Sequence, residues 1–76
     1  MHVELLAYGV IGKDDPYVMG TVSVVNGELH IEGDVPERIK DDIAFERAHT
    51  KVSNEALLLK LTKVFSGSYF RARLVR

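Results

Sequence analysis

Two tripeptides hold the side chains best suited to metal binding: His2-Val3-Glu4 and His30-Ile31-Glu32. Residues two apart on a strand point to the same side, so each tripeptide would place an imidazole beside a carboxylate. On neighbouring strands the four groups would converge and could hold zinc or another divalent ion. A meander instead places one strand between them and separates them by about 9–10 Å. We therefore expect a polar, solvated sheet face and no metal site, with a pH-sensitive His–Glu pair as the alternative.

The segment Gly9-Val10-Ile11-Gly12-Lys13 is a weak match to a phosphate-binding loop. A P-loop has four residues between its glycines and a Ser or Thr after its lysine. Here two residues separate the glycines, and Asp14 and Asp15 follow the lysine, where their charges would repel a phosphate. We interpret residues 9–16 as a structural turn and expect no cofactor.

Side chains for nucleophilic catalysis are sparse. The chain has no cysteine, which excludes thiol nucleophiles, thiolate metal sites and disulfides. It also has no Gly-x-Ser-x-Gly elbow. We assign no catalytic residue, and an enzyme of 76 residues would need to build its pocket between subunits.

Three arginines near the C-terminus are candidates for contact with an anion or a nucleic acid: Arg71, Arg73 and Arg76. They belong to a wider asymmetry, because residues 1–50 carry four basic and ten acidic side chains, and residues 51–76 carry six and one. A basic face could neutralise phosphates. The alternative is that the arginines lie over acidic residues of neighbouring strands, such as Glu4, and we favour it.

A β-hairpin is the clearest structural signal. Asn26-Gly27 suits a two-residue type I′ turn, and the flanking residues alternate between apolar and polar. Such a turn pairs Val24 with Leu29 and Ser23 with His30, so the apolar residues meet on one face. Residues 2–8 predict an earlier strand, and a second strand begins near Tyr17.

Two helices are expected after the hairpin. In the first, Asp34 is the expected N-cap, Ile39 and Ile43 form a narrow apolar stripe, and regular structure should weaken near Ala44. In the second, Ser53 is the expected N-cap, and Gly67 is placed to end the helix in the left-handed region. The apolar face of this second helix consists of Leu57, Leu58, Leu61, Val64 and Phe65.

The last segment, residues 69–75, alternates between apolar and basic side chains, as expected for a half-buried strand. The sequence therefore predicts one α+β domain over residues 1–76, in the order β-β-β-α-α-β. An antiparallel sheet, made of a meander plus the C-terminal strand, is covered on one face by two helices. The place we prefer for the final strand is beside the first.

Some apolar residues fall outside the predicted core. Leu59 points away from the apolar face of the second helix. Leu6 and Tyr8 point away from the Val3 side of the first strand, and Val25 lies on the outer face of the hairpin. In a chain with little core, several such residues favour self-association or a protein partner. Leu6, Tyr8 and Leu59 are the expected interface residues.

Composition places the chain in an ordinary globular class, because 46% of its residues are hydrophobic and 28% are charged. No stretch approaches the roughly 20 apolar residues that span a bilayer, and Met1 to Leu6 lack the basic region expected of a secretory signal. We expect a soluble, cytoplasmic protein that does not bind membranes. The favoured function is a non-enzymatic interaction or assembly module that forms a homodimer. The alternatives are a nucleic-acid-binding accessory protein and a small enzyme with an intersubunit pocket.

Overall fold

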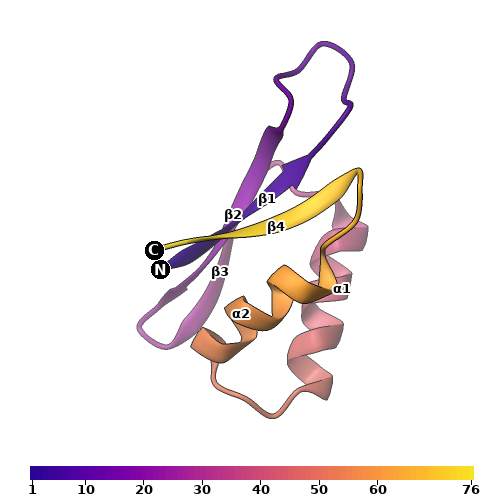
Figure 1. The fold of residues 1–76 in the computed structure, drawn as a ribbon. Coiled ribbons are helices and arrows are strands. Elements are labelled where there is room, and N and C mark those ends of the chain that lie inside the picture. The colour runs from indigo at the N-terminus through magenta and orange to yellow at the C-terminus, as the bar shows by residue number, and fades with distance from the viewer.

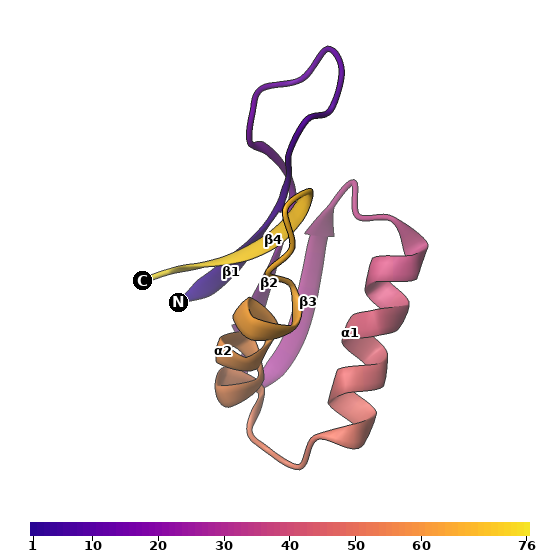
Figure 2. The same ribbon diagram turned by 45° about the vertical axis from the view of Figure 1, so that its right-hand side comes forward.

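The computed structural model describes residues 1–76 as a four-stranded antiparallel sheet with two helices (Figure 1). The elements are β1 (His2–Ala7), β2 (Tyr17–Val25), β3 (Glu28–Gly33), α1 (Glu37–His49), α2 (Asn54–Val64) and β4 (Phe70–Val75). The strand order is β3-β2-β1-β4, so the last strand lies beside the first. Both helices lie on the same side of the sheet (Figure 2). The predicted α+β fold and the preferred place of the final strand are confirmed.

The hairpin between β2 and β3 has the predicted register. Val24 pairs with Leu29 and Ser23 pairs with His30. The turn residues Asn26 and Gly27 have φ values of 52° and 81°, the conformation that Asn-Gly adopts most readily. Turn chemistry and hydrophobic alternation therefore specify the same register.

A β-bulge in β2 sets the other end of the sheet. Leu5 pairs with Gly20 and Leu6 pairs with Val18, so Met19 is an extra residue. Beyond the bulge, Gly20 lies opposite Gly33, and the two backbones approach closely. A Cβ atom on Gly20 would lie 2.2 Å from the carbonyl oxygen of Glu32. Only glycine fits there without a shift of the backbone.

The second helix agrees with its predicted start. The side chain of Ser53 accepts a hydrogen bond from the backbone N–H of Ala56 at 3.1 Å. Leu57, Leu58 and Leu61 are fully buried. The predicted end at Gly67 is wrong, because the helix stops at Val64 and the φ of Gly67 is not positive.

The segment after α2 instead covers the start of the free edge of β4. The Ala72 N–H donates to the Phe65 carbonyl at 2.8 Å, and the Gly67 N–H donates to the Phe70 carbonyl at 3.0 Å. These bonds pair the chain with the strand that follows it. A short turn that pairs Ser66 with Arg71 therefore replaces the helix C-cap expected from sequence.

The first helix differs from prediction at both ends. Asp34 is not its N-cap, because the Asp34 N–H still bonds the Met19 carbonyl of the sheet at 2.8 Å. Pro36 is the N-cap, and no side chain caps the helix. The helix also continues past Ala44 to His49. Ile39 and Ile43 are buried, as the apolar stripe predicted.

Arg47 explains why α1 extends so far. Its guanidinium donates to the carbonyl oxygens of Thr50 and Val52, both at 2.6 Å, and to the side chain of Asn54. Asn54 in turn donates to the carbonyl of Gly27 in the hairpin turn at 2.6 Å. This chain of hydrogen bonds fixes the connection between the helices and ties it to the sheet.

The core lies between the inner face of the sheet and the two helices. The sheet contributes Val3, Leu5, Val22 and Ala72; the helices and their flanks contribute Val35, Ile39, Ile43, Leu58, Leu61 and Phe65. Val3, Leu5 and Val22 are completely buried. The opposite face of the sheet has no helix over it (Figure 2).

We predict that Gly20→Ala destabilises the fold by about 1–3 kcal/mol or more, because the new Cβ would overlap the backbone of β3. Gly67→Ala is the matched control, since its Cβ would meet only the Phe70 carbonyl, at 3.4 Å. Urea denaturation followed by circular dichroism measures both. Equal stability of the two variants would contradict the close approach of β2 and β3.

Candidate interaction site

The two histidines of the His-x-Glu tripeptides lie in one row across the uncovered face of the sheet. His2 and His30 both pair with Ser23, from opposite sides, so β2 separates them as the meander predicted. Nowhere in the chain do three or more His, Asp or Glu side chains gather in a way that could hold a metal ion. His49 is exposed on α1 and stacks on Phe45, with ring centroids 4.1 Å apart.

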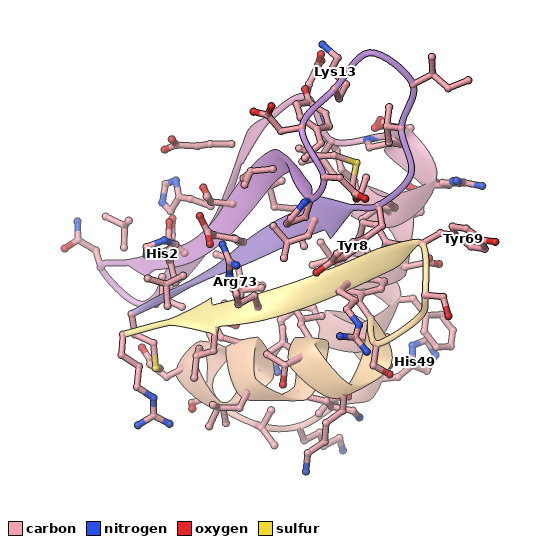
Figure 3. The ribbon with its side chains drawn as sticks, turned by 45° about the horizontal axis from the view of Figure 1, so that its top comes forward. His2, Tyr8, Lys13, His49, Tyr69 and Arg73 are labelled. Carbon is pink, nitrogen blue, oxygen red and sulfur yellow. The ribbon has the colours of Figure 1, made fainter.

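Two of the three candidate arginines already have acceptors within the chain. The Nε and Nη2 atoms of Arg73 both donate to Oε1 of Glu4, at 3.0 and 2.6 Å. Figure 3 shows Arg73 on the side of β4 away from α2. Arg71 donates to the Gly67 carbonyl at 3.1 Å, and Arg76 is exposed at the end of the chain. The expected contact between the basic strand and Glu4 is confirmed.

The expected interface residues have different surroundings. Leu59 is 43% exposed, and Val25 is exposed at the hairpin, as predicted. Leu6 is only 1% exposed, so the expectation that it faces solvent is wrong. At the bulge it lies between Val18 and Arg71 of the adjacent strands. Tyr8 is half-buried, and its N–H bonds the Tyr69 carbonyl.

The loop between β1 and β2, residues 8–16, projects from one end of the molecule (Figure 1). Its two ends are joined by a hydrogen bond from the Gly9 N–H to the Asp15 carboxylate, at 3.2 Å. A turn is closed by the Lys13 N–H and the Val10 carbonyl, also at 3.2 Å. The Lys13 ammonium lies 5.1 Å from the centre of the Tyr17 ring. The loop is therefore braced internally.

The tip of this loop is apolar. Ile11 is 99% exposed and Val10 is also exposed. They lie between Gly9 and Gly12, whose positive φ values, 70° and 80°, turn the chain at each side of the tip. Sequence reasoning missed Ile11 because it treated the glycines as a possible phosphate loop. The available signal was a pair of β-branched apolar residues inside a polar turn.

A shallow pocket of about 230 Å³ opens between α1 and the start of β4. Ile39, Phe65 and Phe70 form its apolar lining, and Arg38 and Asp42 also line it. The two phenylalanine rings meet edge to face, with centroids 4.9 Å apart. Pockets for small-molecule ligands usually measure about 300–1,000 Å³, so this one lies just below that range.

Comparisons with protein-family models, with curated proteins and with solved structures found no match. None of the helices is long and apolar enough to cross a membrane. What the protein does must therefore be inferred from its own geometry. The projecting loop and the elements that form the pocket, the starts of α1 and β4, lie toward the same end of the molecule (Figure 1).

We predict that zinc does not bind stoichiometrically at physiological concentration, because a strand separates His2 from His30. Metal analysis of protein purified without chelator or a histidine tag tests this. Stoichiometric zinc that is lost in the His2→Ala, His30→Ala double variant would contradict the strand order.

Proposed function

We propose that the protein is a non-enzymatic interaction module that associates with itself as a homodimer. The observation that carries the proposal is Ile11, 99% exposed at the tip of an internally braced loop. Burying an isoleucine side chain is worth about 1.5–3 kcal/mol. A braced loop loses little conformational entropy on binding, so much of that gain is available for association.

The small core supports the same proposal. Only 14 of the 76 residues are buried, and a short chain leaves a large fraction of its surface exposed. A partner subunit that binds only the folded state adds stability. Closed two-fold dimers are the commonest oligomers, and they need only one self-complementary surface.

Leu59 remains a second candidate contact. Its neighbours on the outer side of α2 are Glu55 and Lys63, one turn away in each direction. A single exposed leucine among charged residues is common on monomeric proteins. Leu59 therefore supports the proposal less than Ile11 does, and Leu6 no longer supports it.

Nucleic-acid binding through the C-terminal strand is the runner-up. Phosphate contacts need cationic groups whose charge is not already offset. Glu4 offsets Arg73, and Arg71 is partly held by a backbone carbonyl. Steep salt dependence of DNA or RNA binding would favour this function. A small enzyme with a pocket between subunits is the third candidate, and a ligand that co-purifies with the protein would favour it.

We predict a homodimer at micromolar concentration. Sedimentation equilibrium should give twice the mass of the chain. The melting temperature should rise as the protein concentration is increased, because association stabilises only the folded state. A monomer at high micromolar concentration, with a melting temperature independent of concentration, would contradict self-association.

A further inference from the structure

We propose that the loop tip of one copy docks in the pocket of a second copy, with Ile11 against Ile39, Phe65 and Phe70. This inference rests on the proposed self-association and names the surfaces that form it. The pocket has an apolar lining and a volume of about 230 Å³. Ile11 is an apolar side chain with almost no contacts in its own chain. The loop thus supplies an apolar side chain, and the pocket supplies an apolar lining that can receive it.

The charges around the two surfaces are complementary. Arg38 and Asp42, at the pocket, form no ion pair within the chain. Beside Ile11 lie Lys13 and Asp14, which also form none. Docking the tip brings Lys13 and Asp14 of one copy to Asp42 and Arg38 of the other. Complementary charges at the edge of an apolar contact fix its orientation and disfavour other partners.

The placement of the two surfaces suits a closed dimer. The loop extends away from the helices in both ribbon views, so it does not fold onto its own pocket (Figures 1 and 2). The pocket lies where α1 and β4 begin, toward the same end. With a two-fold axis near that end, each copy would place its loop in the pocket of the other copy. Two identical contacts form at once, and no free surface is left to extend a chain of copies.

A membrane is the other surface that an exposed isoleucine could enter. In the loop, Asp14 and Asp15 outnumber Lys13, so anionic lipid would repel its net negative charge. Charge therefore favours a second protein copy with an arginine at its pocket. Co-sedimentation with phosphatidylserine vesicles separates docking on a second copy from insertion into a membrane.

The first test measures the dimer dissociation constant by analytical ultracentrifugation. Ile11→Ser should weaken the dimer by about tenfold or more, since it removes the apolar anchor. Val25→Ser is the matched control, because Val25 is also exposed but lies next to the hairpin turn at the opposite end of the molecule. It should leave the dimer unchanged.

The outcomes separate this inference from the proposed function. A monomeric wild-type protein would overturn both. A dimeric wild type that is insensitive to Ile11→Ser but dissociated by Leu59→Glu would overturn only the docking of the loop. Co-sedimentation of the wild type with phosphatidylserine vesicles, lost in Ile11→Ser, would assign the tip to a membrane and overturn the docking.

The second test locates the contact by cross-linking, which the absence of native cysteine makes unambiguous. Asp14→Cys and Arg38→Cys chains are mixed in equal amounts and oxidised at micromolar concentration. Because loop and pocket residues meet between copies, the mixed disulfide should far exceed the one-half share that random pairing of the two chains would give in mass spectrometry. A statistical mixture of the three species would overturn the docking. Val25→Cys mixed with Arg38→Cys is the control and should give only that statistical mixture.

Discussion

The packing of α2 against the middle of the sheet is the interaction on which the rest of the structure depends. Leu58 and Leu61 meet Val3 and Leu5 in one buried cluster, and none of the four is more than 1% exposed. β1 lies between β2, which follows it in the chain, and β4, the last of the four strands. With its inner face covered by the two helices, the sheet has one face in the core and one face with no helix over it.

The uncovered face of the sheet keeps its possible metal ligands apart. His2 and Glu4 lie on β1, and His30 and Glu32 lie on β3, with β2 between the two pairs. Arg73 is drawn to Glu4, the carboxylate directly opposite it on β1. This cross-strand pair is the one salt bridge on the sheet. The loop and the pocket lie outside this arrangement, which is why they carry the proposed association.

Local signals in the sequence were enough for the hairpin, for the start of α2 and for the alternation of β4. Each of these depends on residues within a few positions: Asn26-Gly27 for the turn, and Ser53 with Ala56 for the cap. The errors at Asp34, Ala44 and Gly67 have a different origin. The Asp34 segment is held by Met19 of the sheet, and the end of α1 is held by the contact of Arg47 with Asn54, partners that the helix-end residues themselves do not show. At Gly67 a tight turn into β4, with Ser66 opposite Arg71, takes the place of a helix C-cap. The burial of Leu6 likewise depends on neighbours from two other strands. The pocket joins Arg38 to Phe70, so it was not visible in the sequence at all.

The pairing of β1 with β4 also affects how the chain is made. His2 lies opposite Val75, so β1, the first of the four strands to be synthesised, gains its second neighbour only after β4 has emerged. During translation the meander and both helices can emerge while one edge of β1 stays open. An open strand edge can pair with the wrong strand, above all between nascent chains. The chain is therefore most exposed to wrong strand pairing during its synthesis, before β4 pairs with β1.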